Sequence, residues 1–348
     1  MLRSLFFTSL FLLPVLSAAQ VPRVTELTRR DVFSDPPTAA CHAATIEEVS
    51  PGHFLTAWFG GSYEGAKDVG IYAARGTGEE WSAPQRLVAP LVLAGDTLPC
   101  WNPVLFLSGS GRLYLFYKAG PNPREWFGGY LTSDDAGDSW STPRYLPEGF
   151  LGPIRNKPIE VSPGVILCGS STESVATDAW RVHLERFTEA SGRWERVEVP
   201  NPREFDIIQP TFLEHGGDTL QLLCRSRHDR LVASWSTDGG HHWSPADTLG
   251  VPNSNSGVDA LTLSPTSFLL VNNPLPRGAD WYNGRNVLDV EYSTDGRHWT
   301  PLLDLERHAD GEYSYPAIIR AADGRIHVVY TYDRKLIRHV AFALFAGE

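Results

Sequence analysis

Short apolar runs recur along the chain at nearly constant spacing, and each begins close after a turn residue. Two examples are Gly111-Arg-Leu-Tyr-Leu-Phe-Tyr117 and Gly324-Arg-Ile-His-Val-Val-Tyr330. The runs begin at Phe54, Leu113, Ile166, Leu220, Phe268 and Ile326, at intervals of 59, 53, 54, 48 and 58 residues. Short apolar runs bounded by turn residues predict β-strands. Their regular recurrence predicts a repeated structural unit.

A polar turn pattern recurs with a similar period. The clear copies are Ser133-x-Asp135-x-Gly137-x-x-Trp140, Ser236-x-Asp238-x-Gly240-x-x-Trp243 and the shortened Ser293-x-Asp295-Gly296-x-x-Trp299, and fainter copies end at Trp81 and Trp194. The Asp can accept hydrogen bonds from backbone amides of its own turn. The Gly permits a positive φ, and the Trp supplies a large apolar group for packing. We therefore expect these serines and aspartates to be structural rather than catalytic.

Together the two patterns predict an all-β fold of six repeats. Each repeat is long enough for a four-stranded antiparallel sheet with its loops, and radial packing of such sheets gives a six-bladed β-propeller. No convincing helical stretch competes with this interpretation. With no linker or low-complexity tract in residues 20–348, we expect this part of the chain to form a single propeller domain.

The first residues have the composition of a signal peptide. Arg3 is followed by an apolar run to Leu16, and Ser17-Ala18-Ala19 supplies small residues for cleavage before Gln20. The run is too short for a comfortable membrane span, although a retained anchor is the alternative. We expect residues 1–19 to be removed and the mature protein to be exported, periplasmic or secreted, without membrane insertion.

Charge and cysteine usage limit the possible partners. The chain has 30 basic and 41 acidic residues and a formal net charge of −11, which disfavours nucleic acid as a partner. A local basic pocket in an acidic protein can still bind an anion. Cys41, Cys100, Cys168 and Cys224 are widely spaced and match neither a zinc site nor a dense disulfide scaffold. The sequence does not decide between one disulfide and four buried free thiols. We expect no metal or cofactor.

Candidate functional residues are distributed over the different repeats. The polar and aromatic groups that stand out near the predicted strands are His42, Trp101, Asn102, Arg155, Lys157, Gln209, Arg225, Arg227, Asn255, Asp259, Tyr313 and Tyr315. The loops at one end of a propeller form a cup, so residues from separate blades can meet at the axis. The alternative is that these groups satisfy loop backbone, and Trp101 could equally belong to the core or form a platform for a sugar.

The polar turns are identified as the Asp-boxes of the sialidase superfamily. The whole mature chain resembles a sialidase-like six-bladed propeller of the BNR-repeat type. Proteins with and without enzymatic activity share this turn, so the motif indicates the fold more strongly than an activity.

The resemblance also implies roles for particular residues. Sialidases hold the substrate carboxylate with three arginines, and a guanidinium can bind that planar anion in a bidentate way. Arg225, in Arg225-Ser-Arg227-x-x-Arg230, matches the second arginine, and Arg285 matches the third. Tyr313-Ser314 resembles the late tyrosine that acts as nucleophile, although counting back from Asp323-Gly324 favours Tyr315. A neutral phenol suits attack at an anomeric carbon that bears a carboxylate.

The chain departs from the sialidase pattern at two positions. His42 stands where the first arginine is expected. Gln209 lies in the region of the glutamate that activates the tyrosine, and a glutamine cannot act as a base. Glu214 lies nearby, but we expect it to turn away with its loop.

Two carboxylates in a Gly-rich loop are candidates for the acid. Glu64 or Asp68 could protonate a leaving oxygen if burial raised its pKa; the alternative is a solvated acid paired with Lys67. Asp259 is a further candidate, because an inverting hydrolase needs two acids with water between them. Asp68 could pair with Asp259, or His42 could serve as the base.

These observations predict an exported, exo-acting glycoside hydrolase of sialidase-like type that cleaves a terminal acidic sugar, sialic acid or a related one, from a glycan. Arg225 and Arg285 would bind the carboxylate, and Arg155 and Lys157 would add positive charge to the cup. One alternative is an enzyme acting on uronate- or rhamnose-containing polysaccharide with His42 as acid/base. The other is a propeller that binds glycans without catalysis.

Overall fold

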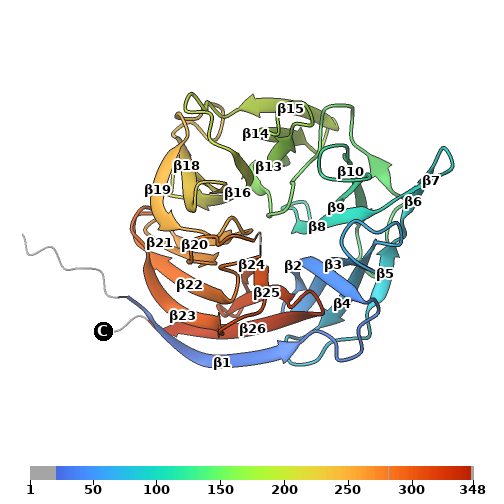
Figure 1. The fold of residues 1–348 in the computed structure, drawn as a ribbon, viewed down its shortest axis with the longest axis horizontal. Helices are drawn as coiled ribbons and strands as arrows, with labels where there is room; N and C mark the ends of the chain where they lie inside the picture. Colours follow the sequence, from blue (N-terminus) through green and yellow to red (C-terminus); the bar gives the residue numbers. More distant parts are fainter. Residues whose placement is uncertain (1–20, 281, 346–348) are drawn as a thin grey trace, which may run out of the picture.

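The computed structural model describes residues 21–280 and 282–345, so the predicted signal peptide lies outside the described residues. Within them, six four-stranded antiparallel sheets are arranged around a central axis (Figure 1), and no helix occurs. The predicted six-bladed propeller is therefore confirmed. It follows that none of these residues forms a helix that could cross a membrane.

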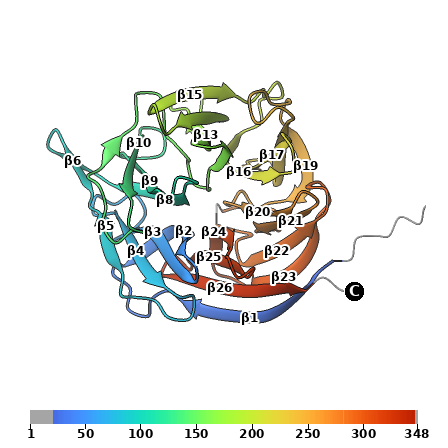
Figure 2. The same cartoon turned by 180° about the vertical axis from the view of Figure 1, so that it is seen from behind.

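The first three blades follow the chain from its innermost to its outermost strand. Blade 1 consists of β2 (Ala40–Ser50), β3 (His53–Gly61), β4 (Gly70–Gly76) and β5 (Gln85–Val88). A small hairpin, β6 (Leu91–Leu93) and β7 (Asp96–Leu98), projects from the rim before blade 2 (Figures 1 and 2). Blade 2 consists of β8 (Cys100–Leu107), β9 (Leu113–Ala119), β10 (Phe127–Ser133) and β11 (Arg144–Tyr145). Blade 3 consists of β12 (Ile159–Ser162), β13 (Val165–Glu173), β14 (Trp180–Thr188) and β15 (Arg193–Glu198).

The last blade closes the ring with the first strand of the chain. Blade 4 consists of β16 (Ile207–Glu214), β17 (Leu220–Ser226), β18 (Arg230–Ser236) and β19 (Asp247–Pro252). Blade 5 consists of β20 (Asp259–Ser264), β21 (Ser267–Asn272), β22 (Val287–Ser293) and β23 (Thr300–Arg307). Blade 6 consists of β24 (Tyr313–Arg320), β25 (Ile326–Tyr332), β26 (Leu336–Phe345) and, outermost, β1 (Arg23–Asp31). Pairing of β1 with β26 joins the two ends of the described chain (Figure 1).

The recurring apolar runs form the second strand of every blade. These strands are β3, β9, β13, β17, β21 and β25. Every residue of β9 is buried, because neighbouring blades cover both faces of the sheet. Burial on both faces gives a continuous apolar run rather than an alternating one, which explains why these strands are so visible in the sequence.

The Asp-box turns connect the third and fourth strands of blades 2, 4 and 5. In blade 2, the Ser133 hydroxyl donates to Asp135 at 2.7 Å and accepts from the amide of Gly137 at 2.7 Å, and Asp135 also accepts from the amide of Ser139 at 2.9 Å. Trp140 packs against the core between blades 1 and 2. The polar groups of this turn therefore serve its backbone, and they lie on the outer side of the blade.

Bulges in the innermost strands determine the shape of the axial region. In blades 1, 2, 4 and 6, the innermost strand shifts register against the second strand at a corresponding position. These innermost strands are β2, β8, β16 and β24. A non-glycine residue with positive φ lies at each shift: Ala43 (55°), Asn102 (39°), Gln209 (55°) and Tyr315 (55°). A bulge bends a strand and redirects its side chains, so these bulges control which groups face the axis.

Cys41, Cys100, Cys168 and Cys224 are all buried free thiols. Of the two possibilities left open by the sequence, the structure has the free thiols.

Candidate functional site

A cup lies at the axis where the innermost strands begin. It is a cavity of about 410 Å³, lined by Glu64, Trp180, Arg225, Arg227, Asn255, Arg285, Tyr315 and Arg334. These residues come from blades 1, 3, 4, 5 and 6, and several of them belong to the loops that connect strands. The cup is therefore built by ring closure and not by any local segment of the chain.

Tyr315 is the phenol of the cup, and it is surrounded by positive charge. Its hydroxyl accepts a hydrogen bond from Arg225 Nη1 at 2.5 Å. The guanidinium carbons of Arg155, Arg225 and Arg285 lie 5.0, 5.6 and 5.7 Å from the centre of its ring. Burial alone would raise the pKa of the phenol, but the charges of Arg225, Arg285 and Arg155 outweigh it and lower the pKa. The site thus makes the phenolate of Tyr315 easier to form than that of an ordinary tyrosine.

Neutral acceptors orient Arg225. Its Nε donates to Asn255 Oδ1 at 3.1 Å, its Nη2 donates to the Asn255 carbonyl at 2.5 Å, and its Nη1 donates to Gln209 Oε1 at 3.2 Å. Burial lowers the pKa of Arg225, but a guanidinium stays protonated at physiological pH. Because these acceptors carry no charge, they fix the guanidinium without cancelling its charge.

A chain of alternating charges crosses the other side of the cup. Arg285 Nη1 donates to Glu312 at 2.8 Å, and Arg334 binds the same carboxylate through Nε at 2.7 Å and Nη2 at 3.1 Å. The remaining face of Arg334 donates to Glu64 in the Gly-rich loop of blade 1. Arg285, Arg225 and Arg334 thus present cationic groups to one cavity, as binding of a carboxylate requires.

Arg334 is a site residue that the sequence analysis missed. It lies in the turn between β25 and β26, where both Asp333 and Arg334 have positive φ. The only sequence signal is a cation in the last hairpin, Tyr332-Asp-Arg334-Lys. It reaches the cup because ring closure places this hairpin beside blade 1.

His42 lies behind Tyr315 rather than in the cup. Its ring centre is 4.2 Å from that of Tyr315, and the side chain is 2% exposed. Both ring nitrogens are buried without a hydrogen-bond partner. Burial and the nearby arginines, of which Arg334 and Arg285 have the largest effects, hold the pKa of His42 well below its usual value. His42 is therefore a neutral imidazole that supports the tyrosine ring.

Arg155 crosses the axis beneath the cup. Its guanidinium donates to the carbonyl of Val258 at 2.8 Å in blade 5 and to that of Pro316 in blade 6. Burial lowers its pKa to about 10. The Arg155 side chain closes the cup at the bottom and is not among the residues that line the cavity.

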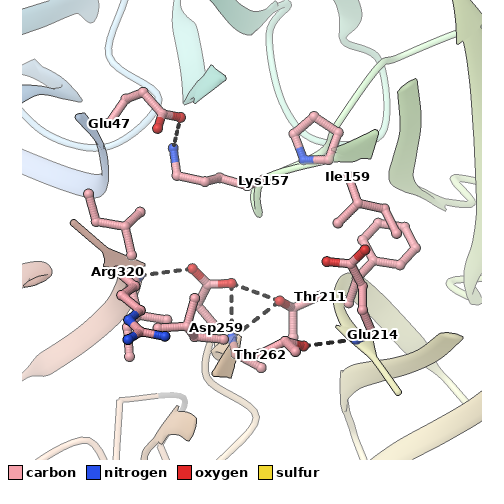
Figure 3. Close-up of a pocket in the computed structure, with 14 residues that line it drawn as sticks. Glu47, Lys157, Ile159, Thr211, Glu214, Asp259, Thr262 and Arg320 are labelled. Atoms are coloured by element: carbon pink, nitrogen blue, oxygen red, sulfur yellow. Dashed lines mark hydrogen bonds and ion pairs between the residues drawn. The ribbon is translucent and has the colours of Figure 1, made fainter. Parts of the chain in front are cut away.

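Lys157 and Asp259 belong to a second cavity at the opposite mouth of the axis (Figure 3), a space of about 270 Å³. Lys157 pairs there with Glu47 at 2.8 Å. Asp259 accepts hydrogen bonds from the Thr211 hydroxyl at 2.7 Å and the Ile318 amide at 3.0 Å, while burial raises its pKa. The expectation that both residues share the cup is wrong, because their side chains line this other cavity instead.

Tyr313 and Asp68 also stand apart from the cup. The Tyr313 ring packs between His308 and Tyr332, at 4.7 Å from each, and burial raises its pKa. Asp68 accepts from the amide and hydroxyl of Ser62, and these bonds lower its pKa. The condition set for Asp68 as an acid, a pKa raised by burial, is not met.

Trp101 and Asn102 form the wall of blade 2. The Trp101 indole nitrogen donates to the carbonyl of Gly120 at 2.8 Å, and its ring contacts Phe59 and Trp126. The Asn102 amide donates to the carbonyl of Ile154 in the segment leading to blade 3. Both side chains are buried and connect neighbouring blades.

Comparison with known proteins supports this architecture. The sequence model of a family described as "BNR repeat-like domain" matches residues 52–328. No curated protein matches the chain in sequence.

Several solved structures resemble the fold. A protein of unknown function from Dyadobacter fermentans is 14% identical with a TM-score of 0.74, over 93% of this chain and all of that one. A mutant of the NanB sialidase from Streptococcus pneumoniae is 11% identical with a TM-score of 0.68, over 90% and 70% of the two chains.

A complex of Trypanosoma rangeli sialidase with sialic acid is also similar, at 13% identity and a TM-score of 0.67 over 92% of this chain and 59% of that one. At these identities the structural likeness shows the fold alone, and the chemistry must be argued from the cup itself.

Proposed function

The chain belongs to the BNR repeat-like family, and we propose that it is an exported, exo-acting glycoside hydrolase that removes a terminal acidic sugar from a glycan. The observation that supports this most directly is the Tyr315 phenol, hydrogen-bonded to Arg225 and facing a cavity lined by Arg285 and Arg334. The sialidase-like fold favours the same reaction class. Export rests on the predicted signal peptide.

The arginines would bind the carboxylate of the sugar. Arg225 and Arg285 converge on the carbonyl of Asn255, at 2.5 and 3.3 Å, so their guanidinium groups lie side by side. A carboxylate bound there would sit close to the Tyr315 hydroxyl. Because Arg155 closes the axis below, the cup is suited to the end of a chain, which is the basis for exo action.

Tyr315 would be the nucleophile. As the phenolate, it forms a bond to the anomeric carbon while the glycosidic C–O bond breaks and its electron pair goes to the leaving oxygen. Once the sugar carboxylate has replaced Glu64 on Arg334, Glu64 would take up a proton from solvent and give it to that oxygen. Glu64 would then take a proton from the water that attacks the anomeric carbon and displaces the phenolate.

The arginine cluster offers a physical reason why Gln209 can stand where sialidases have a glutamate. A glutamate beside the tyrosine would act as a base. Here the charges of Arg225, Arg285 and Arg155 lower the pKa of Tyr315 and favour the phenolate without one. Gln209 instead accepts from Arg225 and helps to hold it against the phenol.

The alternative in which His42 is the acid/base is less well supported. The imidazole is buried and does not line the cup. The cavity that it does line, together with Glu64 and Arg334, has a volume of about 10 Å³, which is too small for a sugar. Binding without catalysis is distinguished from hydrolysis by experiment.

The test is incubation with a panel of acidic oligosaccharides, with released monosaccharide identified by mass. Release of the terminal acidic sugar by the unaltered protein is expected. Tyr315→Phe should lower the rate by at least about 10³-fold while leaving binding of the free acidic sugar intact. Binding on the same panel without any release would contradict hydrolysis and favour a glycan-binding propeller. Full activity of Tyr315→Phe together with loss in His42→Ala would favour chemistry at His42.

A further inference from the structure

A third cavity opens beside the cup, between blades 2 and 3. Its volume is about 310 Å³. The β9–β10 loop supplies Arg124 and Trp126, β10 begins with Phe127, and the segment after β11 supplies Phe150. The end of β13 supplies Glu173. We call this space the aromatic pocket, because aromatic side chains form much of its wall.

The aromatic pocket and the cup share a wall. Glu173 and Trp180 are directly opposite in the antiparallel pair β13–β14, so their side chains project from the same face of the sheet. Glu173 lines the aromatic pocket, whereas Trp180 lines the cup. The guanidinium carbons of Arg227 and Arg225 lie 4.1 and 5.5 Å from the Trp180 ring centre. One strand pair therefore connects the two cavities.

A carboxylate in the turn between β13 and β14 bridges the two rims. Asp178 accepts from Arg227 Nη1 at 3.0 Å on the side of the cup and from Arg124 on the side of the aromatic pocket. These ion pairs hold both rims at a fixed relative position. A ligand longer than one sugar could thus occupy both cavities without rearrangement of the backbone.

The lining of the aromatic pocket suits a neutral sugar ring. Aromatic faces pack against the apolar C–H face of a ring, and a few polar groups at the edge can fix its hydroxyls. Glu173 and Arg124 supply such groups. Because Asp178 pairs with Arg124 and Glu173 adds a carboxylate, the pocket has no excess positive charge that would select a second acidic sugar.

We propose that the aromatic pocket binds the neutral sugar adjacent to the terminal acidic one, and so selects oligosaccharides over short glycosides. This inference rests on the proposed function, because the cup must hold the acidic end. It predicts that most of the affinity gained from the second sugar depends on Trp126 and Phe150.

The experiment compares a free acidic sugar with its extended form by calorimetry, in a Tyr315→Phe background that prevents turnover. The probe pairs are N-acetylneuraminic acid with 3′-sialyllactose, and glucuronic acid with an aldotriouronic acid. For the pair that binds, the extended sugar should bind about tenfold more tightly, equivalent to about 1.4 kcal/mol. Phe150→Ala and Trp126→Ala should each remove most of that gain without changing affinity for the free sugar.

Trp235→Ala is the matched control, since Trp235 is a partly exposed aromatic residue of blade 4 that packs against His215 and Arg297 and lines neither cavity. Thermal unfolding checks that each variant is folded. If the free sugar binds but extension adds nothing, or if Trp235→Ala has the same effect as the other two, this inference is overturned and the proposed function stands. If none of the four probes binds, both are overturned.

Discussion

Arg225 donates a hydrogen bond to the Tyr315 hydroxyl at 2.5 Å although 90 positions separate the two residues. Arg225 lies in the second strand of blade 4, and Tyr315 lies at a bulge in the first strand of blade 6. Asn255, from the segment between them, holds the arginine in place. The contact places the positive charge of Arg225 beside the phenol that we propose as the nucleophile.

The first prediction concerns the ionisation of Tyr315. Arg225→Met removes a positive charge that favours the phenolate, so the pKa of Tyr315 should rise. Ultraviolet titration of tyrosinate, taken as the difference between proteins with and without Tyr315→Phe, would measure it. Arg230→Met is a control at an exposed arginine of the same blade and should leave the titration unchanged. An unchanged curve in Arg225→Met would show that the contact does not control the phenol.

The second prediction concerns Gln209. Gln209 Oε1 lies 3.2 Å from Arg225 Nη1. A carboxylate at the same position would form an ion pair with this guanidinium. Gln209→Glu should therefore weaken binding of an acidic sugar by about tenfold, equivalent to about 1.4 kcal/mol. Gln209→Ala removes the acceptor without adding charge and should have a smaller effect. Tighter binding in Gln209→Glu would contradict this account of the arginine cluster.

The third prediction concerns Glu64, which occupies one face of Arg334. Glu64→Gln removes a carboxylate that competes with the ligand, so an acidic sugar should bind about fivefold more tightly, consistent with up to about 1 kcal/mol for a partly exposed ion pair. Turnover should fall by about 10²- to 10⁴-fold if Glu64 is the acid.

Separate kcat and KM values for Glu64→Gln would show these opposite effects. Asp68→Asn in the same loop is the control and should change neither constant. Weaker binding in Glu64→Gln would instead indicate that Glu64 contacts the substrate directly.

The fourth prediction concerns stability in acid. His327 and His339 form a buried pair, in which His327 Nδ1 lies 2.9 Å from His339 Nε2. Burial lowers their pKa values to about 4 and about 3, whereas both would titrate near 6.5 in the unfolded chain. Between those values the unfolded state binds more protons than the folded state. The free energy of unfolding should therefore fall as the pH is lowered from about 6.5 towards 4.

The slope contributed by each histidine is at most about 1.4 kcal/mol per pH unit. His339→Phe should reduce the slope, even if it lowers stability at pH 7. Urea unfolding at a series of pH values measures it, and His241→Phe, at an exposed position, is the control. An equal slope in all three proteins would exclude the pair as the source of acid sensitivity.

Much of the candidate site could be anticipated from local patterns. Arg225 and Arg285 stand at recognisable offsets from the Asp-boxes, and both reach the cup. Counting back from the last strand favoured Tyr315 over Tyr313, and the structure has Tyr315 in the cup. Position within the repeat predicts that a residue lies near the axis, but it does not give the depth of that residue along the axis. For this reason the prediction of a shared cup failed for Lys157, Asp259 and Arg155.

The sequence by itself determined the blades. A second strand buried on both faces must be largely apolar, and in blades 2, 4 and 5 the turn after the third strand uses the same Ser, Asp and Gly to satisfy its backbone. Both requirements are local, so the strand pattern recurs in every repeat and the full turn pattern in three of them. Only the tertiary structure decided which side chains meet. Ring closure by β1 and β26 brings Arg334 to Glu64, and the bulge at Tyr315 turns its phenol towards Arg225; neither contact is encoded by a local pattern.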